Sequence, residues 1–262
     1  MQHRPLHLVT LALLLSWSSA QAQEGKTKTN QQLVWFVYNN TLTFSPKWAL
    51  ATDIQERRFI NPSAQHQFLV RTKVQYTLGQ GWDVGLGGCI FWQSPNDPNS
   101  TSDLVVPELR PHLEVSQKQK VRFFKINHRY KAEARFFHHV QNGELRDGYS
   151  FRNFRFRYRL GIDVPLLKSA DKKLDRLTLR VNDEIHLNAG EQVVMNTFDQ
   201  NRIYAGISYS ATPDLSIEVG YLNWFQEQPS GDDYFNRNIF RLAINHKISL
   251  EKKKPGAEAP KG

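Results

Sequence analysis

Between Phe151 and Val164, apolar and polar side chains alternate at every position from Phe154 onward. The apolar set is Phe154, Phe156, Tyr158, Leu160, Ile162 and Val164, and the opposite set is Asn153, Arg155, Arg157, Arg159, Gly161 and Asp163. A period of two residues is typical of a β-strand with one apolar and one charged face. A sheet of such strands needs lipid or a protein core against one face, and water or ion pairs against the other.

The first residues have the features of a secretory signal peptide. A cation at Arg4 precedes an apolar run from Leu8 to Leu15, and Ala20 and Ala22 have the spacing expected before a cleavage site. The apolar run is too short to cross a bilayer as a helix. No later stretch approaches 18 uninterrupted apolar residues, so we expect no transmembrane helix in the mature chain.

The rest of the chain suits a single domain. The expected organisation is a signal peptide at 1–22, a barrel at 23–250 and a disordered basic tail at 251–262. Cys89 is the single cysteine, which excludes an intramolecular disulfide. The net charge of +9 raises the question of nucleic-acid binding, but the basic residues alternate along strands instead of gathering in one patch. We therefore expect no nucleic-acid partner.

Eleven strand-like runs can be marked along the mature chain. They lie near 32–44, 47–59, 65–78, 81–93, 104–116, 120–138, 150–165, 174–188, 201–210, 214–225 and 237–250. Short turns follow the first, third, fifth and ninth runs, at 45–47, 79–81, 117–119 and 211–214. Longer polar stretches follow the fourth, sixth, eighth and tenth, at 94–103, 139–149, 189–200 and 226–236. Short turns at one rim and long loops at the other are typical of outer-membrane barrels, whose long loops face outside.

An odd number of runs conflicts with the even strand numbers of single-chain bacterial barrels, whose two ends lie in the periplasm. We therefore expect one further strand, which gives a barrel of about 12 strands, with 10 as the alternative. Residues 23–31 are the nearest unassigned segment. They are polar for a membrane strand, so a short first strand and a segment inside the lumen both remain open.

The placement of aromatic residues favours a membrane barrel over a soluble all-β protein. On the fourth run, the apolar face begins at Trp82 and ends at Trp92, ten positions later. Ten tilted residues rise roughly 25 Å, which is the height of the apolar band between the aromatic girdles of a barrel. A secreted sandwich or a lipocalin-like barrel is the alternative, because its strands also have one apolar face. The sequence thus predicts an all-β, antiparallel transmembrane barrel in the bacterial outer membrane.

The opposite faces of the fifth to ninth runs have charges of both signs, which would line a polar lumen. The expected charge network consists of Glu108, Arg110, His112, Arg129, Glu133, Arg135, Arg157, Arg159, Glu184 and Arg202. Unpaired charges are costly in a narrow lumen, so we expect Arg–Glu pairs. Two roles remain open: a salt-bridged plug that holds the wall together, and a selective path for small anions, since Arg exceeds Glu and Asp on these faces.

Several short segments resemble, in order and spacing, the Gram-negative outer-membrane barrels classified as domain of unknown function 2490. The segments are Trp35, 48–50, 53–57, 108–110, 128–135, 157–159, 182–184, 201–202 and 220–221. The resemblance covers nearly the whole mature chain and implies an outer-membrane barrel without an assigned substrate. Pro107 and Pro111 depart from it. Because proline cannot donate a ladder hydrogen bond, we expect a bulge in that strand.

A lipid hydrolase is the alternative function. Outer-membrane phospholipases and lipid A deacylases set a Ser/His pair on the outer face of the barrel, where the base activates the hydroxyl group. The residues available for such a pair are His128, His138, His139 and Ser150. No serine lies in a recognisable motif near these histidines, so we expect a protein that is not an enzyme.

A metal site is a further alternative. His112 and His186 could bind a metal with Glu108 and Glu184, but only Glu184 and His186 are closely spaced on one strand. We therefore expect no metal and no other cofactor. The expected partners are outer-membrane lipid and small anionic solutes.

Overall fold

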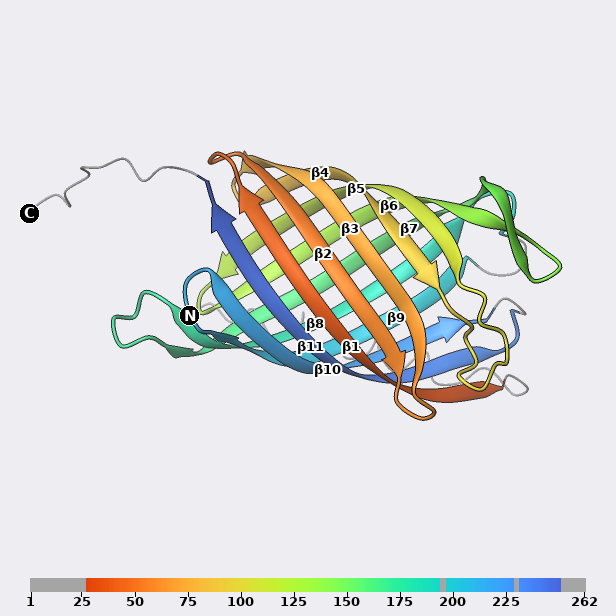
Figure 1. Cartoon of the computed structure of the whole chain (residues 1–262). Coiled ribbons are helices and arrows are strands. Elements are labelled where there is room, and N and C mark those ends of the chain that lie inside the picture. The colour runs from red at the N-terminus through yellow and green to blue at the C-terminus, as the bar shows by residue number, and fades with distance from the viewer. Residues whose placement is uncertain (1–26, 194–196, 229–230, 251–262) are drawn as a thin grey trace, which may run out of the picture.

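The computed structural model describes residues 27–193, 197–228 and 231–250. Eleven strands of these residues form one closed barrel, shown in Figure 1. They are β1 (Lys28–Thr43), β2 (Trp48–Phe59), β3 (Ala64–Gly79), β4 (Trp82–Gln93), β5 (Val106–Val121), β6 (Phe124–Gln141), β7 (Glu144–Lys168), β8 (Asp175–Ala189), β9 (Phe198–Ser210), β10 (Leu215–Glu227) and β11 (Tyr234–Ser249). The expected signal peptide and tail lie outside the described residues. Within them, no helix is long and apolar enough to cross a membrane.

The barrel closes through a parallel seam between its first and last strands. β1 and β11 pair in parallel from Lys28 and Tyr234 to Thr43 and Ser249, whereas all other neighbouring strands are antiparallel. The predicted all-β barrel is confirmed, with one strand fewer than the expected 12 in the described part and one more than the alternative of 10. A parallel pair lets both end strands run toward the short-turn rim, so an odd number of strands closes without a further one.

The two rims differ as the sequence predicts, but two connections lie elsewhere. The expected loop at 139–149 is instead a continuation of the β6–β7 hairpin, which turns at Asn142 and Gly143 and projects beyond the long-loop rim (Figure 1). Both residues adopt a positive φ, as two-residue hairpin turns of Asn-Gly do. The expected turn at 117–119 lies inside β5, and the chain turns after Val121.

Pro107 and Pro111 do not produce the expected bulge. The register between β4 and β5 is continuous past both prolines. Between β5 and β6, pairing stops after Leu109 and resumes at His112 in the same register. The missing N–H group of Pro111 therefore interrupts one ladder locally without an inserted residue.

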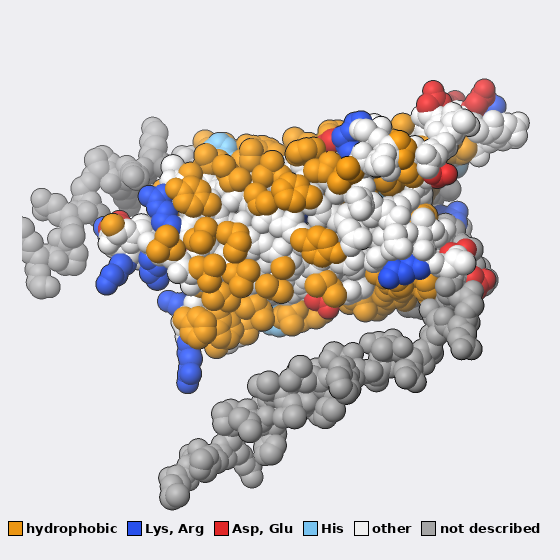
Figure 2. Space-filling model, turned by 90° about the horizontal axis from the view of Figure 1, so that it is seen from below, with side chains coloured by type: hydrophobic (Ala, Val, Ile, Leu, Met, Phe, Trp, Pro, Cys, Tyr) orange, Lys and Arg blue, Asp and Glu red, His pale blue; other side chains and the backbone are white. Residues whose placement is uncertain are grey.

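The outer face of the barrel is an apolar band (Figure 2). Its exposed side chains include Leu86 at 68%, Ile203 at 53% and Phe156 at 49%. On β7, Phe156 and Leu160 are exposed, whereas Arg155 and Arg157 are buried inside the barrel. The alternation of this strand therefore predicted its inner and outer faces correctly. An exposed apolar surface this extensive marks a surface that lipid or another protein covers.

Candidate functional site: the two halves of the lumen

Near the long-loop rim, inward side chains form a layer that is buried around the whole circumference. We call it the closing layer. Each strand contributes at least one side chain that is no more than 4% exposed: Trp35, Phe59, His66, Phe91, Glu108, Glu133, Arg155, His186, Gln200, Trp224 and Arg237, from β1 to β11 in order. A layer that excludes water on every strand closes the lumen.

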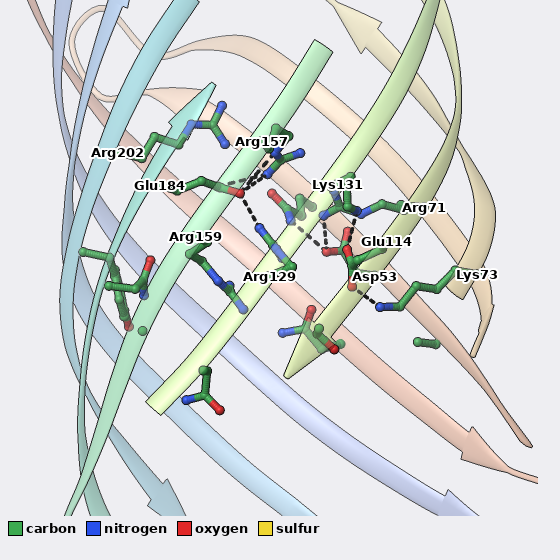
Figure 3. A pocket seen from close by; sticks show the side chains of 18 of the residues that line it. Asp53, Arg71, Lys73, Glu114, Arg129, Lys131, Arg157, Arg159, Glu184 and Arg202 are labelled. Carbon is green, nitrogen blue, oxygen red and sulfur yellow. Dashed lines mark hydrogen bonds and ion pairs between the residues drawn. The ribbon is translucent and has the colours of Figure 1, made fainter. Parts of the chain in front are cut away.

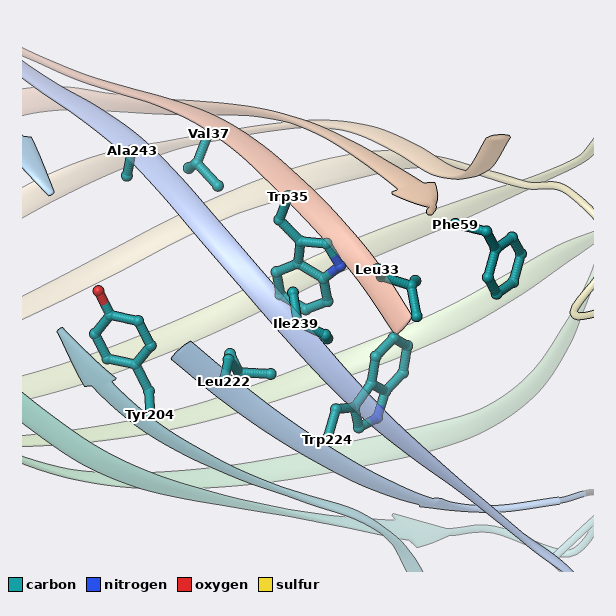
Figure 4. Close-up of a cluster of buried hydrophobic side chains, with 9 residues drawn as sticks. All are labelled: Leu33, Trp35, Val37, Phe59, Tyr204, Leu222, Trp224, Ile239 and Ala243. Atoms are coloured by element: carbon teal, nitrogen blue, oxygen red, sulfur yellow. The ribbon is translucent and has the colours of Figure 1, made fainter. Parts of the chain in front are cut away.

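One side of the closing layer is apolar (Figure 4). Buried side chains from β1, β2, β9, β10 and β11 pack together there: Leu33, Trp35, Val37, Phe59, Tyr204, Leu222, Trp224, Ile239 and Ala243. The rings of Trp35 and Trp224 meet edge to face, with centroids 5.8 Å apart. Aromatic pairs in this geometry contribute about 0.5–1.5 kcal/mol beyond the burial of their area.

Three arginines in or next to this layer, Arg57, Arg202 and Arg237, contact tryptophan rings instead of carboxylates. The guanidinium carbon of Arg57 lies 3.9 Å from the centroid of the Trp35 ring. Those of Arg202 and Arg237 lie 4.5 and 4.4 Å from Trp224. Amide oxygens accept their N–H groups: Gln55 and Gln67 for Arg57, Gln200 for Arg202, and Gln31, Gln226 and Asn96 for Arg237. Cation–π contacts of desolvated groups contribute about 2 kcal/mol, so these cations are held without a counter-ion.

The long loop between β4 and β5 reaches into the barrel at the long-loop rim. The Asn96 carbonyl oxygen accepts a hydrogen bond from the Gln31 side chain at 2.7 Å. The Asn96 side-chain oxygen lies 3.2 Å from both Arg237 Nη2 and His66 Nε2. The loop is thereby tied to β1, β3 and β11, and it adds to the closure of the lumen.

A cavity of about 510 Å³ lies between the closing layer and the short-turn rim. Its lining extends toward that rim as far as Lys118 and Asn245. Its described lining includes 13 lysines and arginines but six aspartates and glutamates. Figure 3 labels some of them: Arg71, Lys73, Arg129, Lys131, Arg157, Arg159 and Arg202, with Asp53, Glu114 and Glu184. Positive charge therefore dominates this half of the lumen.

Two carboxylates of the cavity are each shared by more than one cation. Glu184 accepts hydrogen bonds from Arg129 at 2.5 Å and from Arg157 at 2.9 Å. Glu114 pairs with Lys131 at 2.8 Å and also with Lys73. Sharing of this kind leaves little negative charge for any further cation in the cavity.

The structure divides the ten residues of the predicted charge network into three groups. Glu108 binds two cations, Arg110 and Arg135, each at 2.6 Å. Glu133 and Glu184 are bridged by Arg157, with Arg129 also on Glu184. Glu133 on β6 thus pairs with Arg157 of the neighbouring strand β7. The third group has no carboxylate partner among the residues that the structure describes: His112, Arg159 and Arg202.

Several residues of the lumen were not in the predicted network. Arg71 on β3 pairs with Asp53 on β2 at 2.7 Å. Glu218 on β10 accepts hydrogen bonds from Arg180 and Arg241, each at 2.5 Å. Their signal is the alternation of their own strands, in which each occupies an inward position.

The residues considered for hydrolysis and metal binding are not brought together. The His138 and His139 imidazoles bond backbone carbonyls at 3.2 and 2.8 Å, and neither is paired with Ser150. The His128 ring lies 2.9 Å from the Tyr158 hydroxyl group. His128 is opposite Leu160 on β7, ten residues along that strand from Ser150, so His128 and Ser150 cannot form a pair. Within the described residues, no three His, Cys, Asp or Glu side chains are grouped as metal ligands.

A closed, largely antiparallel barrel with a charged lumen is therefore the class of protein that the fold and the site define. The chain belongs to the family described as protein of unknown function (DUF2490), whose model matches residues 32–236. Among solved structures, it is similar to the NanC porin in a rhombohedral crystal form, with 12% sequence identity and a TM-score of 0.49. The match covers 82% of this chain and 99% of the porin chain. No curated protein matches.

Proposed function

We propose that this chain is an outer-membrane barrel that binds small anionic solutes in a lumen closed at its long-loop half. The cavity between the closing layer and the short-turn rim supports this proposal, because cations exceed carboxylates in the cavity wall. Excess lumenal cations raise the local concentration of anions and exclude cations. In this proposal, outer-membrane lipid is the partner of the outer face and a small anion is the partner of the lumen.

The apolar band supports the membrane location. On β4, Trp82 and Trp92 face outward ten residues apart, which corresponds to roughly 25 Å along the barrel axis. Leu86 and Ile90, between them, are 68% and 44% exposed. Water would meet these apolar side chains in a soluble protein, whereas lipid covers them in a bilayer.

The two roles left open by the sequence then belong to different halves of the lumen. In the closing layer, Glu108 with Arg110 and Arg135 forms a buried network that holds the walls together. In the cavity, the unmatched cations serve anion binding. A solute reaches this cavity from the short-turn rim, since the closing layer blocks the other side. The contacts of His128, His138 and Ser150 do not favour lipid hydrolysis.

Conductance in planar bilayers tests the proposal. The refolded barrel should show no steady current, because the closing layer blocks the lumen. Replacing Trp35 and Trp224 together by Ala should open a steady conductance, and in a salt gradient its reversal potential should have the sign of anion selectivity. A steady current through the unchanged barrel, or cation selectivity of the opened one, would refute the proposal. The matched control is Phe240→Ala, which removes an exposed aromatic ring from the outer face and should stay closed.

A further inference from the structure

We propose that the cavity binds the oxyanion group of a small solute, a carboxylate or a phosphate, between the guanidinium groups of Arg129 and Arg159. This inference rests on the proposed function and specifies the position and the chemistry of the binding site. Arg129 and Arg159 are directly opposite each other on β6 and β7, and both line the cavity. Figure 3 shows their side chains beside each other on the cavity wall.

Arg159 is the unsatisfied cation of this pair. In the part of the chain that the structure describes, it makes no hydrogen bond and no ion pair, and its Nε atom is buried without an acceptor. The Nε atom of Arg129 is also buried without an acceptor. A buried polar group without a partner costs about 1–3 kcal/mol, and a charged one costs more. An anion between the two side chains would remove this cost.

The carboxylates near Arg159 cannot supply that anion. Glu184 lies directly opposite Arg159 on β8, and the like charge of Arg129 lies directly opposite it on β6. Glu184 already accepts hydrogen bonds from Arg129 and Arg157. Glu114 is already shared between Lys73 and Lys131. The local positive charge is therefore unmatched by the protein itself.

The chemistry of the pair selects the class of ligand. A guanidinium group is a planar fork of N–H donors that matches the two oxygens of a carboxylate or a phosphate. Next to Arg159, Gly161 has no side chain, and it lies between Asn127 and Asn182 on the neighbouring strands. A Cβ atom at Gly161 would lie 3.7 Å from that of Asn127 and 3.6 Å from that of Asn182. This leaves space beside the cations, flanked by two amides that can bind other polar groups of the solute.

The unpaired cation also has an energetic signature. In the empty barrel, Arg159 is repelled by Arg129 and lacks a counter-ion, so its charge destabilises the fold. Replacing it by Gln should raise the unfolding temperature of the empty barrel and should also abolish stabilisation by an anion. A residue with a purely structural role would show the opposite sign, because its loss would lower stability. Functional sites commonly keep such a cost in stability.

The test is thermal unfolding of the refolded mature barrel in detergent, titrated with inorganic phosphate or with acetate against chloride at equal ionic strength. We expect phosphate, acetate or both to raise the unfolding temperature of the unchanged protein above the chloride reference. Phosphate alone would identify a phosphate ligand, and acetate alone a carboxylate. Arg159→Gln should weaken binding at least tenfold and raise the unfolding temperature of the empty barrel. The matched control is Arg58→Gln, which removes a cation from an exposed ion pair on the outer face.

An anion effect in Arg159→Gln equal to that of the unchanged barrel would overturn this site, and so would the absence of any effect beyond chloride in the unchanged barrel. A separate measurement, the ion selectivity of the barrel opened at Trp35 and Trp224, tests the proposed function. If that barrel remains anion-selective while Arg159→Gln binds normally, the site is wrong and the function stands. If the opened barrel is not anion-selective, the function itself fails.

Discussion

The three successive inward arginines of β7 show how different the two halves of the lumen are. Arg155, in the closing layer, donates to Asp199 at 3.1 Å and to Asn188 at 3.2 Å. Arg157, at the boundary, bridges Glu133 and Glu184. Arg159, in the cavity, has no partner among the described residues. Arginines at successive inward positions of one strand, from Arg155 to Arg159, are thus paired, shared and unpaired.

This difference teaches that pairing follows exposure to water and not residue type. In the closing layer, a cation without a carboxylate, an aromatic face or an amide would remain desolvated, which is strongly unfavourable. In the cavity, Arg159 is half-buried, so water solvates part of its charge and the unpaired cation remains at a cost that a bound anion would remove. The closing layer consequently stabilises the fold, whereas the cavity keeps a cation that the protein itself does not neutralise.

Glu108→Ala should have the largest effect, because it removes the one buried carboxylate that Arg110 and Arg135 share. Glu108 is 2% exposed, and its removal would leave Arg110 and Arg135 without their shared carboxylate. Removing one partner of a buried ion pair costs about 3–5 kcal/mol. Denaturant unfolding of the refolded barrel measures the loss. The matched control is Glu56→Ala, which breaks the exposed pair with Arg58 and should cost less than about 1 kcal/mol. Equal costs for the two variants would remove the distinction between buried and exposed pairs.

Leu160→Arg tests whether the inner and outer faces of β7 are assigned correctly. The comparison of Arg155, Arg157 and Arg159 depends on that assignment. Leu160 is 39% exposed on the outer face. An arginine that faces lipid near the bilayer midplane costs about 2–4 kcal/mol. Arg157→Lys, on the inner face, should cost less, since the charge remains beside Glu133 and Glu184. Folding stability in lipid vesicles measures both. A harmless Leu160→Arg would mean that the register is shifted by one residue.

Alternation along single strands was sufficient to predict the barrel, its apolar outer band and the inward position of residues such as Arg157. It could not predict the parallel seam, because no local signal tells that the edge of β1 pairs with β11 or that the two strands run in the same direction. It also could not tell Arg155 from Arg159, since both alternate equally well. The carboxylates that could pair with them lie on other strands, and only the closed structure determines the height at which Asp199 or Glu184 lies. The tryptophans of the closing layer were similarly unassigned, as Trp224 faces inward on a strand whose inner partners were unknown.

Gly206→Ala should have an intermediate effect, at the boundary between the halves. The Tyr204 side chain lies over Gly206 and Gly220, and its hydroxyl group donates to Glu218 at 2.7 Å. A Cβ atom at Gly206 would lie 2.1 Å from the Tyr204 hydroxyl oxygen, which displaces the ring. Overpacking of this kind costs about 1–3 kcal/mol. Thermal melting measures it, and Tyr204→Ala provides the second arm of a double-mutant cycle. Strictly additive losses would show that the ring does not occupy the space above Gly206.

Lys118→Ala should have the smallest effect, because it removes an ion pair at the open end of the lumen. The Lys118 ammonium lies 3.5 Å from Asp83, and its side chain is 63% exposed. Asp83 keeps a hydrogen bond from the Thr77 hydroxyl at 2.7 Å, so its carboxylate would not be left without a partner. Pairs this exposed contribute less than about 1 kcal/mol, and salt screens them further. Unfolding at low and high salt should therefore give a small difference that shrinks as salt rises. A loss as large as that of Glu108→Ala, insensitive to salt, would show that the short-turn half depends on its ion pairs as much as the closing layer does, and the contrast between the two halves would fail.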